Sequence, residues 1–141
     1  MRTALLCALL VLIAPLSHAQ ISLPVTFEEG INYELTDFGG TMSQLVADPE
    51  DAENTVVASN RTAAAECFAG TTVAENSGFT PPIPFSEGNL TMSVRVWSPE
   101  AGVRVLFKVE EVGVPEINAE TFTFTTVAMA WETLVFDFGN P

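Results

Sequence analysis

Histidine, cysteine and basic side chains are scarce in this sequence. Its 141 residues include one histidine, two cysteines and five lysines and arginines, against 18 aspartates and glutamates, which gives a formal net charge of −13. Nucleic acid and anionic membrane surfaces need clustered Lys and Arg to replace their counterions, so this charge excludes both classes of partner. Neutral ligands and cations are compatible with it, and acidity that serves only solubility in a salty habitat is an alternative explanation.

The amino-terminal segment holds the longest apolar run. Arg2 precedes apolar residues 4–15, and residues 17–19 offer small side chains at the positions that determine cleavage before Gln20. The run is little more than half of the roughly 20 residues that a membrane-spanning helix needs. We therefore expect a cleavable signal peptide over residues 1–19, a secreted protein (extracellular or periplasmic), and no membrane association.

Cleavage of this segment would remove chemistry on which many enzymes depend. It takes away His18 and Cys7, so Cys67 is left as the single thiol and no internal disulfide can form. Nucleophilic Ser-His-Asp and Cys-His systems need an imidazole, and most catalytic zinc sites need histidine ligands. Two carboxylates would suffice for a glycosidase, yet no local carboxylate motif stands out. We therefore expect no enzymatic activity.

The remainder, residues 20–141, has the length of one domain and consists of short strand patterns separated by turn residues. Residues 90–97 and 103–110 alternate most clearly, and the turn between them predicts an antiparallel hairpin. Residues 120–127 and 131–138 are predicted to form a final pair. The probable core face of that pair carries Leu134, Phe136 and Phe138.

Five more strands are expected in the first half of the domain, at residues 21–27, 33–38, 41–47, 55–58 and 66–73. Residues 76–89 contain three prolines and are expected to form an extended loop. No segment has a sustained helical period. This spacing predicts an all-β fold, an antiparallel β-sandwich of the jelly-roll type.

One face of the predicted hairpin combines basic and aromatic side chains. Cross-strand neighbours project to the same side of a sheet, so the hairpin would gather one patch. The patch comprises Arg95, Trp97, Arg104 and Lys108. An aromatic ring stacks on the apolar face of a sugar, while Arg and Lys donate hydrogen bonds to its hydroxyls. Alternatively, Trp97 closes the edge of the core, and the basic residues pair with acids such as Glu110.

Two acidic segments are candidates for calcium, which takes several oxygen ligands from irregular loops. Residues 48–54 form an acidic loop, but it lacks the turn glycine and the distal glutamate of an EF-hand, so a solvated loop is expected. Glu28 and Glu29, just after the first strand, are the second candidate. Trp131, at the start of the last strand, is expected to belong to the core more than to a ligand site.

Residues 23–30, 91–102 and 130–138 resemble a jelly-roll module of secreted, often marine, bacterial polysaccharide-degrading proteins. The resemblance implies a non-catalytic carbohydrate-binding module whose partner is a polysaccharide such as a β-glucan. Such modules often hold a structural calcium through a glutamate after the first strand, which Glu28 matches. Their second ligand, an aspartate, lies in one more strand beyond residue 138, and Asp137 is not clearly its equivalent.

The sequence stops at Pro141, before that last strand. A truncated gene model, a fragment of a longer enzyme with a further C-terminal domain, and a domain completed by a partner strand are all compatible with this ending. Two other functions therefore stay open. One is a structural or adhesive extracellular module without a sugar ligand, and the other is the N-terminal part of a larger glycoside hydrolase.

Overall fold

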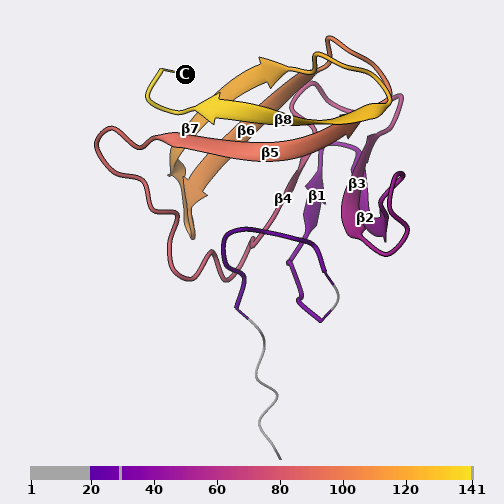
Figure 1. Ribbon diagram of the computed structural model, residues 1–141. Helices are drawn as coiled ribbons and strands as arrows, with labels where there is room; N and C mark the ends of the chain where they lie inside the picture. The colour runs from indigo at the N-terminus through magenta and orange to yellow at the C-terminus, as the bar shows by residue number, and fades with distance from the viewer. Residues whose placement is uncertain (1–19, 29, 141) are drawn as a thin grey trace, which may run out of the picture.

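The computed structural model describes residues 20–28 and 30–140, and Figure 1 shows their arrangement. The predicted signal peptide, residues 1–19, lies outside the described residues, as does Glu29. The described part contains strands and turns but no helix, and hence no helix of the length and apolarity needed to cross a membrane. The strands are β1 (Thr36–Phe38), β2 (Thr41–Ala47), β3 (Thr55–Arg61), β4 (Gly70–Thr72), β5 (Thr91–Ser98), β6 (Arg104–Glu111), β7 (Val114–Phe124) and β8 (Ala130–Asp137).

These strands form antiparallel pairs, which confirms the prediction of an all-β, antiparallel fold. The described residues contain four two-stranded sheets, β1–β4, β2–β3, β5–β8 and β6–β7. In Figure 1, β5 and β8 run side by side, β6 and β7 lie behind them, and the sheets of the first half lie to one side. The arrangement is consistent with a β-sandwich, whereas the jelly-roll topology stays a prediction.

The core of the second half lies between the β5–β8 pair and the β6–β7 pair. Leu134, Phe136 and Phe138 are buried, as their alternation predicts, and Phe136 is only 1% exposed. The Phe107 ring of β6 packs against that of Phe136, with ring centroids 5.0 Å apart. Alternate residues of the neighbouring strands complete this core, namely Met92, Val94 and Val96 from β5, Val105 and Val109 from β6, and Ala119 from β7.

A second hydrophobic cluster lies in the first half, mostly outside regular strands. Its buried members are Ile21, Tyr33 and Ala74. The strand expected at residues 21–27 is not formed. Proline at position 24 has no N–H to donate to a ladder, and Phe27 has a positive φ of 60° that interrupts an extended chain. The strand expected at residues 33–38 shortens to β1, which begins after Glu34 with its positive φ of 49°. The strand expected at residues 66–73 shortens to β4.

The predicted hairpin of residues 90–97 and 103–110 is wrong. β5 pairs with β8 and β6 pairs with β7, so the two strands of that hairpin belong to different sheets. Thr125 explains the difference, because this buried residue after β7 holds the connection between β5 and β6. Its hydroxyl accepts a bond from the Val103 N–H and donates to the Glu100 carbonyl, both at 2.9 Å. The connection therefore crosses from one layer to the other.

The predicted pairing of residues 120–127 with 131–138 is also wrong, because β7 and β8 lie in opposite layers. Glu132 stabilises the turn between them. Its carboxylate accepts hydrogen bonds from the backbone N–H and the hydroxyl of Thr126, at 2.9 and 2.7 Å. Each of the strands β5, β6, β7 and β8 has one apolar face. Stacking the two-stranded ribbon β5–β8 on the ribbon β6–β7 buries all of these faces together, whereas two adjacent hairpins in one sheet would leave the apolar side of that sheet uncovered.

Candidate functional site

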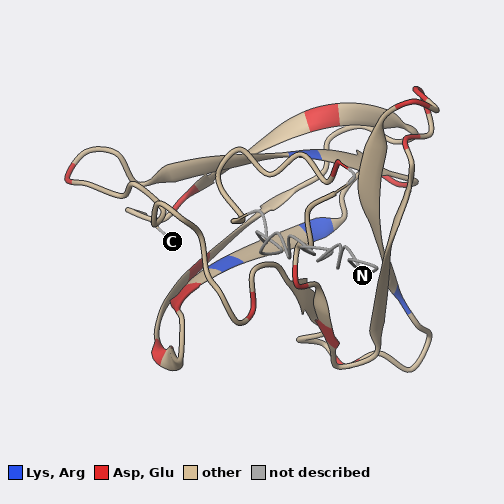
Figure 2. Cartoon of the chain, turned by 90° about the horizontal axis from the view of Figure 1, so that it is seen from below, with Lys and Arg blue, Asp and Glu red and all other residues tan. Residues whose placement is uncertain are grey.

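The four residues predicted to form one patch lie on two opposite surfaces. Arg95 and Trp97 belong to β5, whereas Arg104 and Lys108 belong to β6. The inner faces of the two ribbons pack against each other, so these outward-pointing side chains face away from one another. Figure 2 shows a few basic positions, scattered among more numerous acidic positions. The single patch that the sequence predicted is therefore not formed.

The outer face of β5 and β8 carries a tryptophan pair. Trp97 and Trp131 are direct cross-strand partners, and both are half-buried. The guanidinium carbon of Arg95 lies 5.0 Å from the centre of the Trp131 ring. We call this surface the tryptophan face. From β5 it contains Thr91, Ser93, Arg95 and Trp97, and from β8 it contains Trp131, Thr133, Val135 and Asp137.

The tryptophan face is open to solvent along most of its length. Apart from the two tryptophans, its side chains are exposed, and Val135 at its middle is 60% exposed. At the Trp131 end it is closed by the loop between β2 and β3. A cation over an aromatic ring is worth roughly 0.5–2 kcal/mol, depending on how dry the site is. Because Arg95 is exposed, its contact with Trp131 lies near the lower end of this range.

Asp48 anchors the acidic loop to this face. Its side chain, in a residue only 8% exposed, accepts hydrogen bonds from the Trp131 indole N–H at 2.9 Å and from the Asn54 amide at 2.8 Å. The backbone N–H of Glu50, also bonded to this carboxylate, is the main cause that lowers the pKa of Asp48. The loop of residues 48–54 therefore acts as a structural tie between the β2–β3 hairpin and the start of β8. Trp131 is a part of that tie, which its position in the sequence did not reveal.

Calcium binding stays a prediction. Within residues 20–28 and 30–140, no group of three or more His, Cys, Asp or Glu side chains is placed to hold a metal ion. Glu28 is exposed, and its main-chain carbonyl accepts a long hydrogen bond, 3.4 Å, from the hydroxyl of Tyr33. Asp137 uses one carboxylate oxygen to accept the backbone N–H of Gly139.

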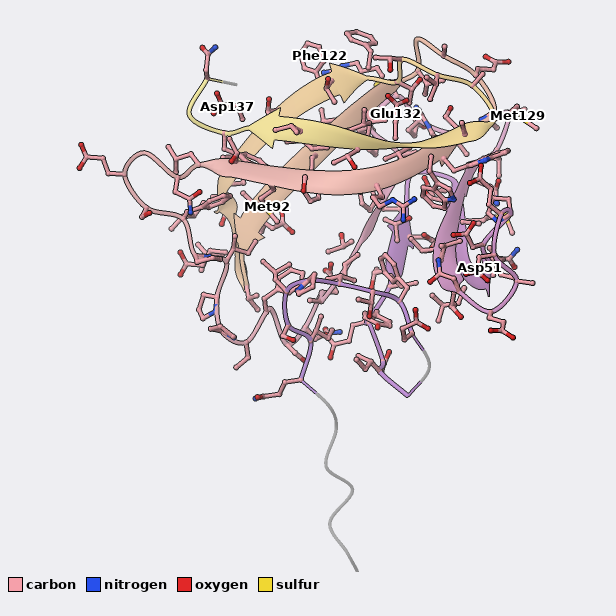
Figure 3. The ribbon with its side chains drawn as sticks, viewed as in Figure 1. Asp51, Met92, Phe122, Met129, Glu132 and Asp137 are labelled. Atoms are coloured by element: carbon pink, nitrogen blue, oxygen red, sulfur yellow. The ribbon has the colours of Figure 1, made fainter. Side chains whose placement is uncertain are left out.

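The opposite surface, formed by the outer face of β6 and β7, is aromatic and apolar. Phe122 and Phe124 are 48% and 49% exposed, and their rings meet edge to face with centroids 5.7 Å apart. The Arg104 guanidinium lies 4.2 Å from the centre of the Phe122 ring. Figure 3 shows Phe122 on the outside of β7, pointing away from β5 and β8. We call this surface, with the exposed Leu106 between its basic residues, the phenylalanine face.

Sequence reasoning missed the phenylalanine face, although a signal was present. Glu120, Phe122 and Phe124 alternate with threonines, so one face of this strand had to be aromatic. Which face would be buried depended on the pairing of β7, and that pairing was predicted wrongly. Lys108 forms an ion pair with Glu110, 2.8 Å between Nζ and Oε2, as the alternative interpretation of the basic residues proposed.

An open cleft adjoins the start of β5. Residues 91–93 form one wall, and the segments around residues 23 and 84 form the other. Its lining is largely apolar and includes Leu23, Pro24, Ile83, Pro84 and Phe85. The cleft thus lies at the end of the tryptophan face that is opposite to the two tryptophans.

Comparison with known proteins identifies no relative of this chain. No protein family, no curated protein and no solved structure that was compared matches it. Any function must therefore be argued from the geometry of the two sheet faces.

Proposed function

We propose that the protein is a secreted, non-catalytic carbohydrate-binding module that holds a polysaccharide, such as a β-glucan, on the tryptophan face. The observation that carries the proposal is the cross-strand pair of Trp97 and Trp131 with Arg95 stacked beside it on an exposed sheet surface. Of the residues predicted for sugar binding, Arg95 and Trp97 belong to this site. Arg104 and Lys108 do not.

The chemistry of the tryptophan face suits a neutral sugar chain. An indole ring offers a flat apolar surface to the C–H face of a pyranose, and a guanidinium donates directional hydrogen bonds to hydroxyl oxygens. Thr91, Ser93 and Thr133 add hydroxyls that can both donate and accept. Because the two tryptophans are already partly ordered by packing and by the Asp48 bond, binding would lose little side-chain entropy.

Affinity electrophoresis of the protein against a panel of soluble and insoluble glycans tests the proposal. We expect retardation by at least one glycan and its loss in Trp97→Ala. Phe122→Ala is the matched control, because it removes an aromatic ring from the opposite surface. Absence of retardation by every glycan, or equal retardation of the wild type and Trp97→Ala, would overturn the proposal.

The phenylalanine face favours a second candidate, a structural or adhesive extracellular module without a sugar ligand. Leu106, Phe122 and Phe124 expose apolar area on one sheet surface, and contiguous patches of this kind often mark contacts with other proteins. The same pair of variants separates the two candidates. Loss of surface attachment in Phe122→Ala, with no glycan bound by the wild type, would favour the adhesive module.

A further inference from the structure

The edge of β5 that faces away from β8 is long and carries little charge. Among the described residues, β5 is hydrogen-bonded only to β8, so the backbone groups along its other edge have no strand partner. Over its eight residues β5 contains no proline and one charged side chain, Arg95. By contrast, β6 carries Arg104, Lys108, Glu110 and Glu111. Natural proteins usually protect an exposed edge with charges, prolines or bulges, because it is a template for pairing with another strand.

A strand that pairs with this edge must match the two faces of the β5–β8 sheet. It needs apolar side chains on the inner side and polar or aromatic ones on the outer side. β5 itself has this pattern, because Met92, Val94 and Val96 point inward while Ser93 and Arg95 point outward. A second copy of β5 running antiparallel would therefore continue both faces. This is the self-complementary arrangement of a twofold symmetric dimer.

We propose that two copies of this chain pair through β5, antiparallel and with the twofold axis at Val94, into one four-stranded sheet. In this register Ser93 lies opposite Arg95 of the second copy, so the two arginines do not face each other directly. Met92 meets Val96 on the inner side. Thr91 meets Trp97 of the second copy on the outer side, where the apolar cleft begins.

The cleft supports this register. Thr91 and Ser93 line it, and Leu23, Ile83 and Pro84 give it apolar walls. The indole of Trp97 from the second copy would lie at its mouth, so an apolar ring that is half-buried in one chain gains further apolar contacts. The cleft adjoins the β5 edge, and the proposed twofold arrangement uses both.

The charge of the chain predicts how this association depends on salt. Each copy carries a formal net charge of −13, so two copies repel each other at long range. Salt screens this repulsion but leaves the backbone hydrogen bonds and apolar contacts of the edge nearly unchanged. Association through β5 should therefore strengthen as salt is added, whereas association by opposite charges should weaken.

Sedimentation velocity of the purified full chain, over a range of protein and salt concentrations, tests the proposal. We expect the mass to move from monomer to dimer as either concentration rises. Ser93→Lys places a like charge opposite Arg95 of the second copy and should weaken association by about tenfold. Ser93→Glu places an opposite charge there, which offsets the added net negative charge, so it should weaken association less than Ser93→Lys does.

Val135 provides the matched controls. It is the cross-strand partner of Ser93, on the same face but on β8, so Val135→Lys and Val135→Glu add the same charges away from the β5 edge. Both should associate like the wild type. A protein that stays monomeric under all conditions would overturn the proposal. So would a dimer that Ser93→Lys leaves intact and Phe122→Ala dissociates, because that dimer would use the phenylalanine face.

Discussion

Different interactions stabilise the two halves of the molecule, the first with β1 to β4 and the second with β5 to β8. In the second half, strands of eight to eleven residues stack two apolar faces, and phenylalanine rings fill the space between them. In the first half, two of the strands have only three residues, and the hydrophobic cluster around Tyr33 is built largely from loops. Carboxylates that accept backbone N–H groups hold these loops. Burial of apolar area thus dominates in the second half, although the Glu132 carboxylate holds one of its turns in the same way. Ionised side chains contribute more to the first half.

Glu34 and Asp37 show how the first half is held. The Glu34 carboxylate accepts hydrogen bonds from the backbone N–H groups of Asn76 and Ser77, both at 2.9 Å, and from the Ser77 hydroxyl. The Asp37 carboxylate accepts from the Ser43 hydroxyl and backbone N–H at 2.7 Å, and from the Thr71 hydroxyl. Each carboxylate joins segments that are distant in the sequence.

The largest effect on this comparison should come from the core of the second half. Phe136→Ala removes a ring that is 1% exposed and leaves a cavity between the ribbons, so we expect it to lower the free energy of unfolding by about 3–5 kcal/mol. Urea denaturation followed by tryptophan fluorescence measures this. Val135→Ala, one residue away on the exposed side, should change it by less than about 0.5 kcal/mol. Similar losses in both variants would show that the ribbons do not pack as described.

The next effect is a loss of order in the first half at low pH. The Ser77 hydroxyl and backbone N–H lower the pKa of Glu34, and the Ser43 hydroxyl and N–H lower the pKa of Asp37. A carboxyl whose pKa falls on folding contributes stability above its unfolded pKa, about 4, and this contribution is lost as the pH falls through its lower folded pKa. We therefore expect the loops of the first half to loosen below about pH 4, before the sandwich does.

Amide NMR signals of the two halves, followed as the pH is lowered, measure this order of events. Glu34→Gln resembles the protonated side chain and should loosen residues 76 and 77 already at neutral pH, with a weaker dependence on pH below about 4. Glu87→Gln, at an exposed carboxyl for which no hydrogen bond is described, is the control. Simultaneous loss of signals from both halves, unchanged in Glu34→Gln, would contradict the distinction drawn between them.

A smaller effect should follow from cutting the tie between the halves. Trp131→Phe keeps an aromatic ring beside Arg95 but removes the indole N–H that donates to Asp48. We expect the Tm to fall by about 3 °C and the loop of residues 48–54 to exchange its amide hydrogens faster, while the sandwich core is unchanged. Hydrogen exchange detected by mass spectrometry gives both readouts. Unchanged exchange in the loop would show that Asp48 does not depend on Trp131.

The smallest expected effect concerns calcium at Glu28. If a calcium ion binds there, chelation should lower the Tm by about 1–2 °C, because a ligand that binds only the folded state stabilises it by mass action. Glu28→Gln should lower the Tm by a similar amount and abolish the response to chelator. If the Tm of the wild type is the same with and without chelator, calcium does not stabilise the first half through Glu28.

Alternation along the strands predicted several strands of both halves correctly. Residues 41–47 match β2, and the inward positions of β5, β6 and β8 all lie in the core described. Alternation states which side of a strand a residue faces, but it carries no information about which strand lies beside it. The connection at residues 99–103 could have been a hairpin turn, and the bonds of Thr125, more than 20 residues later in the sequence, make it a crossing between layers.

The candidate site was predicted only in part for the same reason. Arg95 and Trp97 share a face because they are two residues apart on one strand, a fact that needs no partner. The structure adds Trp131 and Asp48 to the site and removes Arg104 and Lys108 from it. Strand pairing decides the surface on which Trp131, Arg104 and Lys108 lie, and a contact with Trp131, 83 residues away in the sequence, decides the position of Asp48. The sequence by itself determined the all-β class, the acidic charge and the inward or outward side of most strand residues, since these follow from composition and local geometry. Only the tertiary structure decided which outward residues share a surface, since that depends on contacts between segments distant in the chain.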